Sequence, residues 1–179
     1  MSFKTVFFKG FFCVLFPLTA WAQTPAAKDL GPASTEEEFE RQYQDRIKKD
    51  KLNGVYIPKN LDEAMTELDK RISDESKLKF KALPEDSVCQ IMHYRLGNWI
   101  ILNWGFYGGS RLSHYLRSAG VTFPDDMADF LILAYHRRLN AKPIGIKELA
   151  LDFRERRKKE HQERLKKGEV IHEEIRKKN

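Results

Sequence analysis

The segment 127–139 places the strongest constraint on the fold, because it is apolar almost all round. Residues 130–135 read Phe-Leu-Ile-Leu-Ala-Tyr, and Ile132 is the one β-branched residue among them, which favours a helix over a buried strand. Pro124 suits the first position of that helix, and Asp125-Asp126 suits the positive end of its dipole. A helix that is apolar on every side must be enclosed by other elements, so we expect it at the centre of the domain.

The rest of this region has further helical patterns and no alternating, strand-like segment. Asn53-Gly54 marks a turn before it, and Asn60 can cap a helix with apolar residues at spacings of three and four over 61–72. Residues 85–103 place one broad apolar face on a helix, and Ser110 can cap another. A sheet would have no partner strands. We therefore predict an all-α fold, a compact bundle of about five helices.

Two less apolar segments flank this bundle. The pattern Ser34-x-x-Glu37 is a capping box that opens a helix over 35–50, whose thin apolar stripe indicates a solvated or loosely docked helix. A long last helix begins at Ile146 and is charged nearly all round beyond Phe153, which indicates a projecting helix or partial disorder. The predicted divisions are a flexible leader with a charged helix (23–54), a helical domain (55–150) and a basic, charged helical tail (151–179).

Residues 1–22 have the pattern of a cleavable export signal. Two lysines precede the apolar stretch 10–18, and Ala20-Trp21-Ala22 offers the small residues that a signal peptidase needs. The apolar stretch is much shorter than the roughly 20 residues of a membrane-spanning helix. We expect cleavage between Ala22 and Gln23 and a periplasmic or secreted mature protein.

The net charge of +6 is concentrated at the C-terminal end of the chain. Residues 154–179 hold eleven Lys or Arg and six Asp or Glu, a net charge of +5, and residues 1–22 hold two lysines. Residues 23–153 are then about neutral, which argues against a nucleic-acid-binding face on the folded domain. The tail permits weak contact with an anionic surface, although its interleaved glutamates offset part of the attraction. No cofactor is expected, since an exported protein meets no steady supply of ATP or NAD.

A series of short sequence blocks runs through the second half of the predicted bundle. The blocks are Gly97, Asn103-Trp104-Gly105, Gly108-Gly109-Ser110-Arg111-Leu112, Pro124-Asp125-Asp126-Met127, Tyr135-His136-Arg137 and Leu139-Asn140. In this order and spacing, the chain resembles a small bacterial family catalogued as domain of unknown function 6794, over about residues 57–150. It departs from that family with Leu102 in place of an arginine and with Thr122-Phe123 where a histidine is expected, so a polar site of the family would be reduced here. The family has no established activity, so the resemblance implies a fold boundary only.

Two hypotheses on function come from different classes. We favour a non-enzymatic envelope protein that binds another protein, with Trp104 and Arg111 as the aromatic and arginine anchors that interfaces favour. The alternative is a small-ligand binder or hydrolase-like enzyme, which requires polar groups to converge in one pocket. Its candidate residues are Asn103, Arg111, Asp125, Asp126 and His136.

Two further residues complete the candidate binding set. Ser110 lies in the Gly-Gly-Ser-Arg segment, whose backbone N–H groups could bind an anion at the start of a helix, although an ordinary turn is the commoner use of such a segment. Arg137 directly follows His136. No metal site is predicted, because the histidines lack the helical partner of a zinc motif. Cys89 is the one cysteine left after export, and its apolar helical setting favours a buried, inert thiol, with a disulfide-linked dimer left open.

Overall fold

The computed structural model describes residues 33–167 of the chain, so the predicted export signal and the last part of the tail lie outside the described residues. The described part is predominantly helical and has one short hairpin, which confirms the all-α prediction. In chain order the elements are α1 (Glu36–Arg46), β1 (Lys51–Leu52), β2 (Val55–Tyr56), α2 (Leu61–Arg71), α3 (Asp74–Lys81), α4 (Glu85–Met92), the π-helical turn η1 (His93–Gly97), α5 (Asn98–Asn103), α6 (Arg111–Ser118), α7 (Pro124–Leu139) and α8 (Ile146–Lys167).

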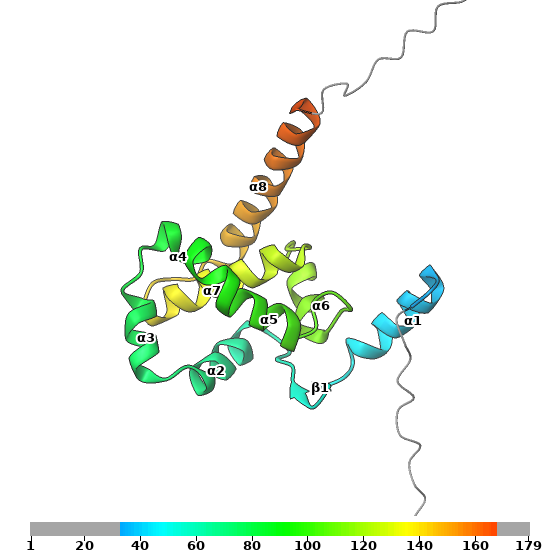
Figure 1. Cartoon of the computed structure of the whole chain (residues 1–179), viewed down its shortest axis with the longest axis horizontal. Coiled ribbons are helices and arrows are strands. Elements are labelled where there is room, and N and C mark those ends of the chain that lie inside the picture. The colour runs from blue at the N-terminus through cyan, green and yellow to red at the C-terminus, as the bar shows by residue number, and fades with distance from the viewer. Residues whose placement is uncertain (1–32, 168–179) are drawn as a thin grey trace, which may run out of the picture. The chain divides into compact units, whose positions relative to one another are not determined.

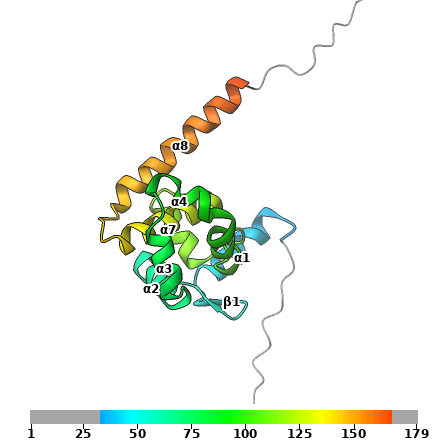
Figure 2. The same ribbon diagram turned by 60° about the vertical axis from the view of Figure 1, so that its left-hand side comes forward.

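Helix α7 is the central element, as its apolar sequence predicts. It contacts α2, α3, α4, η1, α5, α6 and α8, and Figures 1 and 2 show the bundle helices gathered around it. Pro124 occupies the first turn, and the side chains between Met127 and His136 are buried apart from the half-buried Asp129 and Leu133. A helix enclosed in this way holds the other helices together through its own apolar surface.

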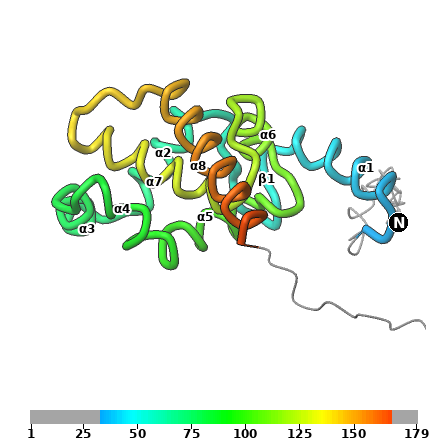
Figure 3. Tube along the Cα trace, turned by 90° about the horizontal axis from the view of Figure 1, so that it is seen from above, coloured from blue at the N-terminus to red at the C-terminus, as the bar shows by residue number. Residues whose placement is uncertain are grey.

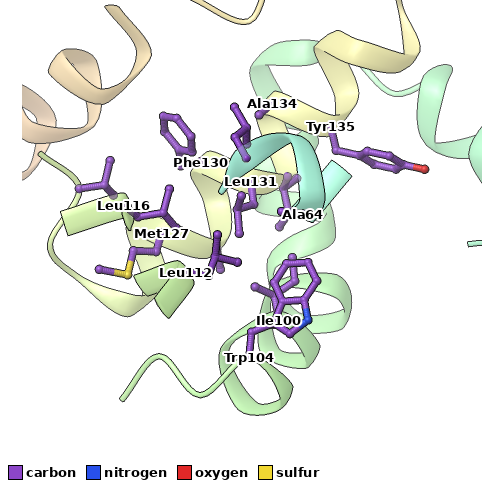
Figure 4. Close-up of a cluster of buried hydrophobic side chains, with 14 of the residues drawn as sticks. Ala64, Ile100, Trp104, Leu112, Leu116, Met127, Phe130, Leu131, Ala134 and Tyr135 are labelled. Atoms are coloured by element: carbon purple, nitrogen blue, oxygen red, sulfur yellow. The ribbon is translucent and has the colours of Figure 1, made fainter. Parts of the chain in front are cut away.

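The centre of the core lies where α2, α5 and α6 meet α7 (Figure 4). Ala64 lets α2 approach closely, while Ile100, Leu112, Phe130 and their neighbours fill the space with fully buried side chains. Burial of a side chain of this size stabilises the fold by roughly 1.5–3 kcal/mol. These contacts fix the relative positions of the four helices.

Helices α4, η1 and α5 follow one another without a break, which confirms the predicted helix over 85–103. Together with α2, α3, α6 and α7 they make the expected bundle of five helices. The π-helical turn at 93–97 widens one turn of this helix. Such turns occur frequently at functional sites, because they change which side chains share a face.

The helix caps follow the sequence in most places. The side chains of Asn60 and Ser110 accept hydrogen bonds from the backbone at the starts of α2 and α6, as predicted. The predicted capping box at Ser34-x-x-Glu37 is wrong by one residue: Thr35 caps α1 by accepting from the N–H of Glu38 at 3.2 Å. Ser34 and Thr35 are both good caps, so local sequence does not distinguish them.

The hairpin corrects the expectation that the chain has no strands. Lys51 pairs with Tyr56 and Leu52 with Val55 in an antiparallel ladder, closed by the predicted turn at Asn53-Gly54. Both turn residues have positive φ, 49° and 77°, as this type of hairpin requires. Strands of two residues are too short to show an alternating pattern, which is why the sequence did not reveal them.

The two flanking helices are attached to the bundle in different ways. Helix α1 is largely exposed, with Tyr43 as its buried residue. Helix α8 runs through residue 150 without a break and packs on α7 through Leu149, Ala150 and Phe153, all buried. Figure 3 shows α8, in orange to red, crossing α7. The predicted division between 150 and 151 therefore falls inside a packed helix.

Candidate functional site

Trp104 lies at the end of α5, where it belongs to the core. Its side chain has no exposed surface, and its ring packs edge-on against Trp99 with the ring centroids 5.7 Å apart. The expectation that Trp104 contacts a partner is therefore corrected: the ring fills the interior beneath its loop. Phe106 is equally buried, while Tyr107 is 65% exposed. Asn103 donates from its Nδ2 to the carbonyl oxygen of Trp99 at 2.8 Å, a contact within α5.

Helix α1 packs against the glycines of the Gly-Gly-Ser segment. Arg46 donates from Nε to the carbonyl oxygen of Gly109 at 2.9 Å, and the ring of Tyr43 lies against the same residue. A Cβ on Gly109 would lie 2.2 Å from Cδ2 of that ring, and Gly109 has a φ of 84°, so only glycine fits. The Tyr43 hydroxyl and Nδ1 of His114 share a hydrogen bond of 2.9 Å. The surface of this segment is thus covered by the chain itself.

Ser110 uses its polar groups within the start of α6. Its N–H donates to Oγ of Ser113 at 2.8 Å, and the N–H of Ser113 donates to Oγ of Ser110 at 3.2 Å. Both serines are fully buried. This reciprocal cap consumes donors that an anion site would need, which favours the interpretation as an ordinary turn before a helix.

Arg111 joins α6 to the hairpin and to α2. Its Nε donates to the carbonyl oxygen of Ile57 at 2.6 Å, and its guanidinium lies 5.0 Å from the ring centroid of Tyr56 and 3.8 Å from Glu63. Glu63 also accepts from the N–H of Lys59 at 3.0 Å and from the Tyr56 hydroxyl at 2.8 Å. These hydrogen bonds, the one from Lys59 first, lower the pKa of Glu63 to about 2. The arrangement is a structural network.

Asp126 attaches α8 to the start of α7. Its carboxylate, buried at 7% exposure, accepts two hydrogen bonds from Arg157, at 2.8 Å from Nε and 2.7 Å from Nη2. Arg156 approaches the same carboxylate at 3.5 Å. Asp125, by contrast, is largely exposed and lies 3.9 Å from Nε2 of His93. The two neighbouring aspartates therefore have different environments and separate roles.

His136 and Arg137 contact the segments on either side of α7. The buried His136 shares a 2.9 Å hydrogen bond between its Nε2 and the carbonyl oxygen of Leu83. Arg137 donates to Glu85 at 2.7 Å and to the carbonyl oxygen of Ile144 at 2.9 Å. His136 is thus hydrogen-bonded to neighbouring backbone, and Arg137 to both backbone and a carboxylate.

The polar residues of the alternative hypothesis do not converge. Arg111, Asp126 and His136 have different partners on different elements. The cavity that Asp126 lines includes neither of the other two. Within residues 33–167 there is also no group of three or more His, Cys, Asp or Glu that could hold a metal ion. A pocket for a small ligand built from these three residues is therefore absent from the described part of the chain.

A candidate binding site that includes none of these predicted residues lies beside Trp99. An open groove of about 660 Å³ lies between α2 and α3 on one wall and the helix α4–η1–α5 on the other. We call it the Trp99 groove. Its lining residues are Leu68, Arg71, Ile72, Ser73, Ser76, Phe80, Met92, Arg95, Leu96 and Trp99. Most of them are apolar, and Leu68 and Phe80 form a buried floor.

The π-helical turn shapes this groove. It follows Met92 directly and contains Arg95 and Leu96, and Trp99 comes one turn later in α5. Met92, Leu96 and Trp99 are only half-buried, although they pack against the core. The wall therefore presents apolar surface that α7 does not cover, and uncovered apolar surface of this kind marks interaction sites.

The charge of the Trp99 groove is positive. Among the described residues, its lining includes two arginines and no carboxylate, and Arg71 lies 3.9 Å from Glu67, which is outside the lining. The guanidinium of Arg71 lies 5.0 Å from the ring centroid of Trp99. Arg95 is exposed, and within the described part of the chain its side chain makes no hydrogen bond or ion pair. A partner with acidic groups would therefore find an unpaired cation at this groove.

Sequence reasoning missed this groove, although one signal was present. The helix over 85–103 shows one broad apolar face, and the sequence does not indicate which part of that face a neighbouring helix leaves uncovered. Which part of that face stays open depends on where α3 lies. That position is set by long-range contacts with α7.

Comparisons with known proteins agree with the resemblance seen in the sequence. The model of the family described as "Domain of unknown function (DUF6794)" matches residues 57–139, from the end of the hairpin to the end of α7. The searches among curated proteins and solved structures found no match. Within the described range no helix has the length and hydropathy of a membrane span.

Proposed function

We propose that this chain is a non-enzymatic, exported protein of the bacterial cell envelope that binds an amphipathic, acidic helix of a partner protein in the Trp99 groove. The observation that supports the proposal most is the groove itself: an apolar floor between two helical walls, with two arginines and no carboxylate among its described lining residues. A groove of this kind is the receptor half of the helix-in-groove mode of recognition.

The apolar floor sets the first requirement on the partner. Phe80 and Leu68 close the bottom, while Ile72, Leu96 and Trp99 remain half-exposed along the sides. A helix that places leucines at spacings of three and four would cover these three side chains at once. Each square ångström of apolar surface removed from water contributes about 25 cal/mol.

The arginines set the second requirement. Arg95 has no hydrogen-bond or ion-pair partner in the part of the chain that the structure describes, so pairing it with a glutamate of the incoming helix breaks no contact there. Arg71 is held over Trp99 and is already placed beside the apolar floor. Acidic residues that flank the apolar stripe of the partner would therefore give orientation and specificity, while the stripe supplies most of the affinity.

The export part of the proposal is supported by the sequence of residues 1–22. Positive residues, an apolar stretch and Ala20-Trp21-Ala22 occur in the order that export signals require. Expression of the full chain in a bacterial host, followed by cell fractionation and N-terminal sequencing, should give a periplasmic or secreted product that begins at Gln23. Replacing Ala22 with Arg should block the cleavage. A product that keeps Met1 and stays in the cytoplasm would contradict the export part.

A peptide titration tests the binding part. The probe is a designed fluorescent helix with leucines along one face and glutamates beside them, titrated with the purified full chain and read by anisotropy. Ser76→Trp places a large ring into the groove at an exposed position of α3 and should abolish binding. Ser118→Trp makes the same change at an exposed position of α6 outside the groove and should leave binding unchanged. Equal binding by both variants would remove the groove as the site.

A further inference from the structure

We infer that a second groove, between α8 and the segment leading into α7, binds a free single-chain carboxylate with an apolar tail, that is, an anion of the fatty-acid type. The groove has a volume of about 470 Å³, and Val121, Phe123 and Phe153 form its apolar floor. We call it the Phe123 groove. It shares no lining residue with the Trp99 groove, so this inference goes beyond the proposed function.

One face of α8 forms a basic wall of this groove. The α8 residues that line it are Phe153, Arg154, Arg157, Lys158, Glu160, His161 and Arg164. Positions 154, 158 and 161 follow the spacing of a single helix face. Glu155 and Glu163 do not line the groove. Basic and acidic residues alternate in the sequence, but two of the glutamates lie outside the groove lining. The groove side of α8 therefore has a net positive charge.

Part of that charge is unpaired. Arg157 is occupied by Asp126, which raises the pKa of the guanidinium, and it lies 4.5 Å from the ring centroid of Phe123. Lys158 and Arg164, in contrast, are exposed and make no ion pair within residues 33–167. Among the described lining residues, the carboxylates are those of Asp126 and Glu160, and both lie beside Arg157. An incoming anion therefore meets two cations that form no ion pair with any described residue.

The position of the apolar floor identifies the rest of the ligand. Val121 and Phe153 are buried, and Phe123 is 49% exposed, so the floor is recessed but open to a chain that enters the groove. A flat bilayer surface meets projecting residues first, whereas a single acyl chain can enter a groove and cover Phe123. The carboxylate of such a molecule then lies at the rim, within reach of Lys158 and Arg164. This juxtaposition of a recessed apolar floor and a cationic rim fits a free anionic amphiphile.

Isothermal titration calorimetry tests the inference directly. Dodecanoate, kept below its micelle concentration, is titrated into the purified full chain, with dodecyl glucoside as the uncharged probe and acetate as the headgroup alone. Lys158→Gln removes a rim charge, and Phe123→Gln removes the exposed part of the floor. Lys159→Gln is the matched control, since Lys159 is an exposed neighbour in α8 that does not line the groove.

The expected result is saturable binding of dodecanoate and much weaker binding of the other two probes. Lys158→Gln should raise the Kd about fivefold, as for the loss of one cation beside an anion, and Phe123→Gln should raise it about tenfold. Lys159→Gln should leave the Kd unchanged. Equal losses at Lys158 and Lys159 would overturn the inference. The inference would also be overturned if the Phe123→Gln variant bound phosphatidylglycerol vesicles tightly and no binding of dodecanoate were seen, because α8 would then act by adsorbing to a membrane surface. If Phe123→Gln fails to fold, the comparison of Lys158 with Lys159 still decides.

Discussion

Replacing Gly109 with alanine should detach helix α1 from the bundle. The new methyl group would meet the ring of Tyr43 at 2.2 Å from Cδ2 and 2.6 Å from Cε2, distances that no side chain can keep. The ring must therefore move out of its site. Because Tyr43 is the buried residue of α1, the helix loses its main attachment when the ring leaves.

The size of the effect follows from two separable costs. A non-glycine residue at a φ of 84° costs roughly 1–2 kcal/mol in backbone strain. Displacing Tyr43 loses roughly 1.5–3 kcal/mol of burial, and the hydrogen bonds to His114 and from Arg46 add about 1 kcal/mol each. The chain entropy regained by α1 offsets part of this loss, so the second cost is about 2 kcal/mol net. Gly54→Ala is the matched control, since Gly54 has a φ of 77° and nothing within 4 Å of a new Cβ.

A double-mutant cycle measures the second cost. The free energy of unfolding is obtained from urea denaturation followed by circular dichroism, for Gly109→Ala, Tyr43→Ala and the double variant. Gly109→Ala should cost about 2 kcal/mol more than Gly54→Ala, and that excess should vanish in the Tyr43→Ala background. Trypsin should also cleave α1 faster in Gly109→Ala. Equal costs for the two glycine variants, or an excess that persists without Tyr43, would refute the contact.

Three further outcomes follow from other parts of the structure. Asp126→Asn should lower the free energy of unfolding by about 2 kcal/mol and raise hydrogen exchange in α8, because Arg157 loses a charged, bidentate partner; unchanged exchange in α8 would contradict this. Glu63→Gln should lower the free energy of unfolding by about 1 kcal/mol at pH 7, after allowance for the 28% exposure of the Glu63 side chain. The folded-state pKa of Glu63, about 2, lies below its ordinary value of 4.5, so the stabilisation from its carboxylate is complete above about pH 4.5 and declines as the pH falls towards 2. The urea midpoints of wild type and Glu63→Gln should therefore converge near pH 2. A difference between the midpoints that stays constant with pH would refute the assignment. Burial raises the pKa of Cys89 to about 12, so iodoacetamide should modify it at pH 8 only after unfolding in urea, as mass spectrometry would show; rapid labelling of the folded chain would contradict a buried thiol.

The parts of the fold that the sequence predicts are those governed by local rules. The apolar run of α7, the cap at Ser110 and the proline at the first turn each act over a few residues, and all three are confirmed. Errors occur where two local choices are nearly equal or where the signal is too short. Thr35 caps α1 in place of Ser34 next to it, and strands of two residues leave no periodic pattern.

The candidate site is less predictable, because exposure is a property of the whole fold. Trp104 and Trp99 both lie on an apolar helix, yet the first is fully buried and the second remains half-exposed beside α3. Arg111 and Arg95 are both helical arginines followed by a leucine, but Arg111 donates to the carbonyl oxygen of Ile57, while Arg95 has no hydrogen-bond or ion-pair partner among residues 33–167. These differences arise from contacts between segments far apart in the sequence, such as that of Arg111 with Ile57.

A charge-exchange experiment tests the central claim, that the Trp99 groove recognises an acidic amphipathic helix. The Kd of the full chain is measured for two leucine-striped peptides that differ only in flanking residues, glutamate in one and lysine in the other. Wild type should prefer the glutamate peptide, and Arg95→Glu should reverse that preference, whereas Arg41→Glu, an equal change at an exposed position of α1, should preserve it. If Arg95→Glu and Arg41→Glu shift the preference equally, or if wild type shows none, the Trp99 groove is not the binding site for such a helix.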